Sequence, residues 1–195
     1  MSHVIVIEFV SLDGAVQDPD GAERTEWGGW AFRYGPEAVA GDKFQLGEAL
    51  DRGALLLGRR TWERFAGLWP SRTDAFSTRM NRVPKLVLSR SLEDVGAWGN
   101  SCVVRGDLAH EVSSRSGDLV VAGSTSVVDA LRERDLVDEY RLLVFPCVLG
   151  RGRRLFPDGI ESVSLELTSA QRVGPAALLV YERSRPEEVS CSTCS

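Results

Sequence analysis

Short apolar runs rich in β-branched residues alternate along this chain with segments whose apolar residues recur at helical spacing. The run Val4–Val10 predicts a first strand, because β-branched side chains suit a pleated, buried surface. Similar runs predict strands over residues 54–57, 84–89, 101–104, 118–123 and 139–148. Helical spacing predicts helices over residues 36–51, over about 125–134 and in the segment that begins near Trp62. This alternation favours an α/β fold with a mostly parallel sheet and helices on both faces.

The last two strand-like runs, over residues 162–168 and 176–182, flank Gly174 and Pro175. Such a pair predicts a closing antiparallel hairpin at one edge of the sheet. The long run over residues 139–148 suits a buried interior strand or a strand that pairs across a homodimer, and its periodicity fits both.

Composition limits the classes of function. The chain has 195 residues and a formal net charge of −5, which disfavours nucleic acid and anionic membranes as partners. No apolar run reaches membrane-spanning length and no signal peptide is evident, so we expect a cytoplasmic protein. Cys102 and Cys147 sit in apolar runs and are predicted to be buried. His3 and His110 are isolated, so we expect no metal site.

The segment Leu55–Trp62 combines a buried strand with a following helix. The strand ends at Gly58, and Arg59, Arg60 and Thr61 precede the helical pattern. Helix N-termini carry free N–H groups and partial positive charge, so this junction predicts a phosphate socket. A surface turn with two solvated arginines explains the segment equally well.

Three further junctions follow predicted strands. They are Ser11–Val16, Leu88–Arg90 and Ala122–Ser126. Small residues and hydroxyl groups in the last of these allow close approach of a pyrophosphate at a helix N-terminus. Because the carboxyl ends of parallel strands meet at one edge of a sheet, the four junctions together favour a phosphate-rich cofactor.

These motifs, together with Leu136–Tyr140 and Pro146–Phe156, resemble the dihydrofolate reductase-like superfamily in order and context. The resemblance is greatest to the C-terminal reductase domain of the bifunctional deaminase-reductase of riboflavin biosynthesis. It implies a three-layer αβα fold and NADPH-dependent reduction of a small substrate. The substrate would be a pterin-like or 5-amino-6-(5-phosphoribosylamino)uracil-like heterocycle.

The resemblance also implies roles for individual residues. Asp13 is the one candidate catalytic residue and lies in a loop that would cover the nicotinamide. Ser124 departs from the family, which often has a second glycine at this position. The residues implied to bind NADPH are Gly58, Arg59, Arg60, Thr61, Leu88, Ser89, Arg90, Gly123, Ser124, Thr125, Ser126 and Val127.

Aromatic residues near the predicted first helix are the candidates for substrate contact. Phe9, Trp30 and Phe32 could stack on a planar heterocycle, as could Trp27 and Tyr34. Capping of the core is the alternative for this cluster. Folate reductases place a carboxylate a few residues beyond a Trp, and none follows here, so we do not expect a folate reductase.

We expect residues 1–184 to form one reductase-like domain and residues 185–195 to form a disordered tail. The tail ends in Cys191 and Cys194 among Ser and Thr, which resembles the core of a ribosomally made, modified peptide. Two hypotheses therefore stay open: an NADPH-dependent reductase, or a non-catalytic scaffold whose tail is changed by a tail-modifying enzyme.

Overall fold

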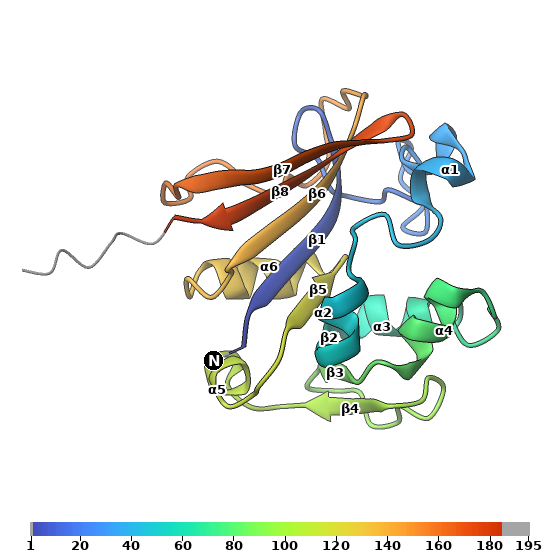
Figure 1. The fold of residues 1–195 in the computed structure, drawn as a ribbon, viewed down its shortest axis with the longest axis vertical. Coiled ribbons are helices and arrows are strands. Elements are labelled where there is room, and N and C mark those ends of the chain that lie inside the picture. The colour runs from blue at the N-terminus through green and yellow to red at the C-terminus, as the bar shows by residue number, and fades with distance from the viewer. Residues whose placement is uncertain (1, 185–195) are drawn as a thin grey trace, which may run out of the picture.

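The computed structural model describes residues 2–184, which form one eight-stranded mixed sheet covered by helices (Figure 1). The spatial order of the strands is β4-β3-β2-β5-β1-β6-β8-β7, and every neighbouring pair from β4 to β6 is parallel. The strands are β1 (Val4–Ser11), β2 (Ala54–Gly58), β3 (Lys85–Leu88), β4 (Ser101–Val104), β5 (Leu119–Ala122), β6 (Glu139–Phe145), β7 (Leu165–Val173) and β8 (Ala176–Arg183).

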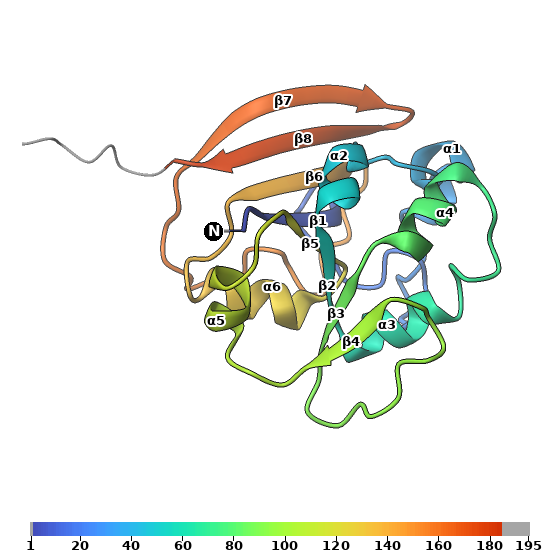
Figure 2. The same cartoon turned by 60° about the horizontal axis from the view of Figure 1, so that its bottom comes forward.

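The helices lie on both faces of the sheet, so the predicted three-layer α/β architecture is confirmed. Figure 2 shows α5 and α6 on one side of the central strands and α3 and α4 on the other. The helical elements are η1 (Phe32–Tyr34), α1 (Pro36–Val39), α2 (Gly47–Arg52), α3 (Arg59–Ala66), α4 (Ala75–Arg82), α5 (Leu108–Ser113) and α6 (Thr125–Arg132).

Alternation along β1 separates two hydrophobic cores. Val4, Val6 and Val10 pack with α5 and α6, whereas Ile5 and Ile7 pack with α2, α3 and α4. Successive strand residues point to opposite faces, so one strand serves both layers. At about 1.5–3 kcal/mol for each large apolar side chain, these two clusters account for most of the stabilising burial.

The antiparallel hairpin predicted at the end of the chain is confirmed. β8 pairs with β6 and β7 pairs with β8, both antiparallel. Gly174 has φ +59°, a conformation that glycine adopts without strain in a tight turn. β6 lies inside the sheet between β1 and β8, in agreement with the interior interpretation of its apolar run.

The single helix predicted over residues 36–51 is wrong. It is two short helices, α1 and α2, separated by Gly41 at φ +78°. The Asp42 carboxylate accepts hydrogen bonds from the N–H groups of Leu46 and Gly47 at 2.8 and 3.0 Å. These bonds occupy the first N–H groups at the start of α2, so the second helix begins anew instead of continuing the first.

The predicted burial of both cysteines is also incorrect. Cys102 is exposed on β4, the edge strand of the sheet, whereas Val104 on the same strand is buried. Cys147 follows β6 and is half-buried. The tail prediction for residues 185–195 and its Cys191 and Cys194 falls outside the described residues.

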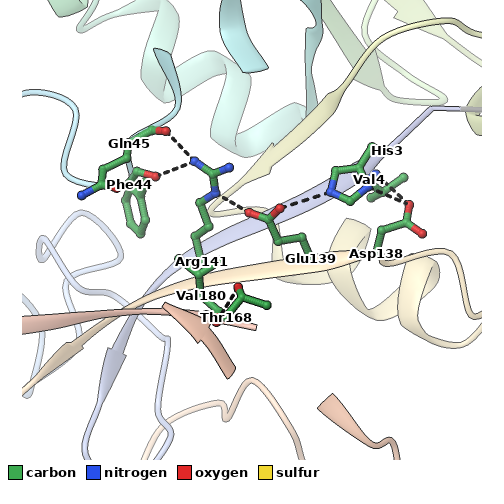
Figure 3. Close-up of polar contacts among 9 residues, drawn as sticks. All are labelled: His3, Val4, Phe44, Gln45, Asp138, Glu139, Arg141, Thr168 and Val180. Atoms are coloured by element: carbon green, nitrogen blue, oxygen red, sulfur yellow. Dashed lines mark hydrogen bonds and ion pairs between the residues drawn. The ribbon is translucent and has the colours of Figure 1, made fainter. Parts of the chain in front are cut away.

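A polar network joins the amino ends of β1 and β6, as Figure 3 shows. Nε2 of His3 lies 3.2 Å from Oε2 of Glu139, and Arg141 also contacts Glu139. Arg141 reaches across to the carbonyl of Phe44 at 3.0 Å. The hydrogen bond with Glu139 is the main reason that the pKa of His3 is raised.

Candidate cofactor-binding cleft

A cleft of about 1920 Å³ lies along the carboxyl edge of the parallel strands. It is lined by the ends of β1, β2, β3 and β5 and by the segments that follow them. Pairing between β1 and β5 stops at Ile7 and Ala122 because β5 ends there, whereas β1 continues to Ser11. Ligand pockets of about 300–1,000 Å³ are usual, so this cleft has room for a cofactor and a second molecule.

The β2–α3 and β5–α6 junctions are joined by the hydroxyl group of Ser124. Ser124 Oγ accepts a hydrogen bond from the N–H of Gly58 at 2.8 Å and donates to Oγ1 of Thr61 at 2.9 Å. Oγ1 of Thr61 in turn donates to the carbonyl of Gly123 at 3.1 Å. Residues more than 60 positions apart in the chain thus hold one rigid wall of the cleft.

Both helices that begin at this wall lack a side-chain cap. The residues before α3 and α6, Gly58 and Ser124, provide no side-chain hydrogen bond to the first turn. Gly123 has φ +59°, which glycine adopts freely and which lets the backbone turn sharply into α6. Free N–H groups at two adjacent helix N-termini form a favourable site for anionic oxygen atoms.

Arginine side chains add positive charge beside these helix ends. Arg59, Arg60 and Arg90 are exposed and line the cleft. Arg59 pairs with Glu63 at 3.5 Å, whereas Arg60 and Arg90 make no ion pair within residues 2–184. A guanidinium group that is not already engaged can form forked hydrogen bonds with a phosphate.

The predicted residues of the β3 junction also line the cleft. Leu88 is half-buried there, and Ser89 Oγ accepts a hydrogen bond from the N–H of Leu92 at 2.9 Å. This bond stabilises the turn that presents Arg90. The remaining predicted positions, Thr125, Ser126 and Val127, form the first turn of α6 and line the cleft as well.

The loop after β6 contributes Arg153 to the cleft. Nη1 of Arg153 donates to Oγ1 of Thr125 at 2.6 Å, and the side chain lines the cleft. The backbone at Arg154 forms an isolated antiparallel bridge with Ala15, which fixes this loop against the one after β1. Arg153 therefore belongs to the positively charged wall.

Asp13 is held by hydrogen bonds that favour its carboxylate form. It accepts from the Ser11 hydroxyl at 2.7 Å and from the N–H groups of Leu149 and Gly150 at 3.0 and 2.8 Å. These bonds, that from Ser11 above all, lower the pKa of Asp13 to about 2. Such a carboxylate suits an anchor between two loops better than an acid that releases a proton near neutral pH.

The aromatic candidates separate into two groups. Phe9 and Phe32 line the cleft and meet edge to face, with ring centroids 6.4 Å apart. Trp30 is only 1% exposed and does not line the cleft. Its indole N–H donates to the carbonyl of Gln17 at 2.8 Å and its ring packs on Phe145, so Trp30 caps the core.

Sequence interpretation missed Glu8, an acidic residue in the middle of β1. Glu8 lines the cleft and is 4% exposed, and burial raises its pKa to about 8. The available signal was a single acid within the otherwise apolar run Val4–Val10. Within residues 2–184, no group of three or more His, Cys, Asp and Glu residues could hold a metal ion. None of the helices in this range has the length and apolar character that crossing a membrane requires.

Together, the fold and the cleft define an α/β protein with a positively charged edge suited to phosphate groups, next to an aromatic part of the same cleft. The model of the RibD C-terminal domain matches residues 2–179, and the chain belongs to this family. It is a reductase family whose members generally use NADPH.

Several solved structures share the fold of this chain. A suggested riboflavin biosynthesis protein from Shewanella sp. PV-4 has a TM-score of 0.71 and 21% identity, covering 94% of this chain and 99% of its own. A pyrimidine reductase-like protein from Corynebacterium diphtheriae has a TM-score of 0.63 and 13% identity, covering 95% and 93%. RibD of Acinetobacter baumannii has a TM-score of 0.61 and 15% identity, covering 94% of this chain but 58% of that chain.

A curated relative is also similar in sequence. The uncharacterized protein YyaP of Bacillus subtilis (strain 168) is 23% identical over 126 residues, which is 60% of this chain and 66% of that protein. The structural similarities establish the fold, and the predicted resemblance to the riboflavin-biosynthesis reductase domain is confirmed by the family match.

Proposed function

We propose that this protein is an NADPH-dependent reductase of a small unsaturated heterocycle. The observation that carries the proposal is the pair of uncapped helix N-termini joined through Ser124. Beside them lie Arg60 and Arg90, which make no ion pair within residues 2–184. This arrangement provides N–H donors for a pyrophosphate and separate guanidinium groups for a further phosphate.

The residues of the cleft fit the chemical groups of NADPH. The first turns of α3 and α6 would hold phosphate oxygens, and Arg153 would close the wall from the opposite loop. Arg60 and Arg90 would meet the 2′-phosphate, which is the group that distinguishes NADPH from NADH. When bound, NADPH supplies a hydride to an unsaturated carbon of the substrate.

The aromatic part of the cleft would position the second ligand. Phe9 and Phe32 present apolar surface to the cleft, and a planar heterocycle stacks well on such rings. The volume of the cleft supports simultaneous binding of cofactor and substrate. A pterin-like or aminouracil-like ring is the class of substrate that we propose.

Nucleotide titration of variants at the free arginines tests this function. Arg90→Ala should weaken NADPH binding about tenfold to hundredfold and leave NADH nearly unchanged, because a charge-assisted hydrogen bond is worth about 1.5–3 kcal/mol. Arg60→Ala should behave similarly. The measurement is quenching of tryptophan fluorescence, and Arg82→Ala, an exposed arginine that does not line the cleft, is the matched control.

Two outcomes would contradict the proposal. Equal weakening of both nucleotides would exclude recognition of the 2′-phosphate by these arginines. Failure of the unaltered protein to bind NADPH at all would favour a scaffold that keeps the fold without the activity.

A further inference from the structure

Glu8 lies on β1 just beyond the point where the neighbouring strand β5 ends. Pairing of β1 with β5 ends at Ile7 and Ala122, and Glu8 is the next residue of β1. On its other side β1 stays paired with β6, where Leu142 is the partner of Glu8. Because side chains alternate, Glu8 shares its face of β1 with Val6 and Val10, which pack in the core beneath α6.

The Glu8 carboxyl group is buried, and one of its two oxygen atoms is unpaired within residues 2–184. The residue is 4% exposed, and its Oε1 atom makes no hydrogen bond within the described part of the chain. Leaving a buried polar group unmatched costs about 1–3 kcal/mol, so native proteins rarely keep one without a reason. A leucine would fill this position beside Val6 and Val10 without that cost.

Glu8 differs from the other buried acids in this respect. Asp18, for example, accepts hydrogen bonds from the N–H groups of Glu23 and Thr25 at 2.8 and 2.9 Å and from the Thr25 hydroxyl. Glu8 instead borders the open cleft. A group bound in the cleft would supply the partner that the described residues do not provide.

We propose that the Glu8 carboxyl group recognises the amide-like edge of a ring bound in the crevice between β1 and β5. This proposal rests on the function proposed above. An amide-like edge presents an N–H donor next to a carbonyl acceptor, as a carboxamide or a pyrimidine lactam does. A carboxylic acid presents the matching pair, an O–H donor next to a carbonyl acceptor, and so forms two hydrogen bonds with such an edge.

The surroundings of Glu8 keep its carboxyl group protonated, as this pair of hydrogen bonds requires. Burial alone raises the pKa of Glu8 to about 8, so the acid form prevails at neutral pH. Tyr140 of β6 belongs to the core cluster on this face of β1, and Asp18, Arg134 and Arg153 line the same cleft as Glu8. None of these four groups contributes to the shift.

Two bound groups carry the required chemistry: the carboxamide of the nicotinamide ring and the ring of the second ligand. Binding of three probes to the full chain distinguishes them. The probes are 2′,5′-ADP, which lacks the nicotinamide, NADPH, and 5,6-diaminouracil with NADP⁺ present. The variants are Glu8→Leu, which removes both polar atoms, and Glu8→Gln, which keeps a neutral donor and acceptor.

We expect Glu8→Leu to weaken NADPH or diaminouracil binding about tenfold to hundredfold, because two hydrogen bonds are lost. Weaker NADPH binding assigns the contact to the carboxamide, and weaker diaminouracil binding alone assigns it to the second ligand. Glu8→Gln should stay within about threefold of the unaltered protein. Unchanged binding of 2′,5′-ADP, together with a cooperative thermal transition, shows that the variants are folded.

A pH titration gives a second test that does not need the leucine variant. The ratio of the affinity for the affected probe to that for 2′,5′-ADP should fall between pH 7 and pH 9 in the unaltered protein and stay flat in Glu8→Gln. The role of Glu8 is overturned if Glu8→Leu binds every probe as tightly as the unaltered protein does. It is also overturned if the pH profiles of the unaltered protein and Glu8→Gln are identical. Absence of any nucleotide binding to the unaltered protein instead overturns the proposed function together with this inference.

Discussion

Replacing Glu8 with glutamine should change how the stability of the folded protein depends on pH. The Glu8 carboxyl group has its ordinary pKa of 4.5 in the unfolded chain and a pKa of about 8 in the folded protein, because burial disfavours the charged form. Below pH 4.5 both states hold the proton and the group has no net effect. Between pH 4.5 and 8 the unfolded chain releases the proton and the folded protein does not, so stability falls as pH rises.

The size of this effect follows from the shift. One pKa unit corresponds to about 1.4 kcal/mol, so a shift from 4.5 to about 8 corresponds to roughly 5 kcal/mol lost once the pH exceeds 8. The free energy of unfolding of a small domain is about 5–15 kcal/mol, so this loss is a large share of the total. Glutamine stays neutral at every pH and should abolish the slope that Glu8 causes.

Urea unfolding of the ligand-free protein at pH 5, 6, 7 and 8, followed by tryptophan fluorescence, measures the effect. The difference in unfolding free energy between Glu8→Gln and the unaltered protein should grow by about 1.4 kcal/mol per pH unit. His3 and the other titratable groups are common to both proteins and cancel in this difference. Glu93→Gln, at an exposed position, is the control. Parallel stability curves for Glu8→Gln and the unaltered protein would refute the argument that burial holds a proton on Glu8.

Two further changes test the structure away from Glu8. Gly28→Ala should destabilise the protein by about 2 kcal/mol in thermal unfolding, because the added Cβ would lie 2.2 Å from Oδ2 of Asp18. The control Gly99→Ala, where the space around the added Cβ is open, should cost less than about 0.5 kcal/mol, and equal effects of the two changes would contradict the reasoning. His3→Gln should lower the free energy of unfolding by less than about 1 kcal/mol at pH 5 and leave it unchanged at pH 9. The half-exposed His3 has a raised pKa, so its protonated form stabilises the fold below pH 6.5, and this effect is lost as the pH rises through the pKa of the folded state. A loss of stability that is the same at both pH values would contradict the prediction.

Most of the fold could be predicted from long periodic segments of the sequence. The central strands and α6 were predictable because their apolar residues form unbroken runs or a clear helical stripe. The helices α4 and α5 were not predicted, since each has only two buried residues and shows no clear apolar stripe. Both begin at an aspartate that accepts a backbone N–H, Asp74 and Asp107, so the capping residue was the signal that could have located them.

The position of the four junctions at one edge of the sheet could be predicted from the topology, whereas the hydrogen bonds that hold this edge together could not. Parallel strands bring their carboxyl ends together, so four separate junctions could be placed at one edge from order alone. The bond from Arg153 to Thr125 depends on where a long loop returns, which local patterns do not encode. Ser124 illustrates the same limit: a serine in place of a second glycine predicts a looser approach to pyrophosphate, yet its hydroxyl group connects Gly58 with Thr61.

The two acids of β1 and its loop show why chemical roles need the structure. Asp13 and Glu8 are five positions apart, and only Asp13 lies in a motif that draws attention. Hydrogen bonds from Ser11 and two N–H groups stabilise the charged form of Asp13, whereas burial stabilises the neutral form of Glu8. Their pKa values therefore move apart, to about 2 and about 8. When the environments of two carboxyl groups move their pKa values apart in this way, one group serves as an ionised anchor and the other keeps its proton. Here Asp13 is the anchor and Glu8 is the group that keeps its proton.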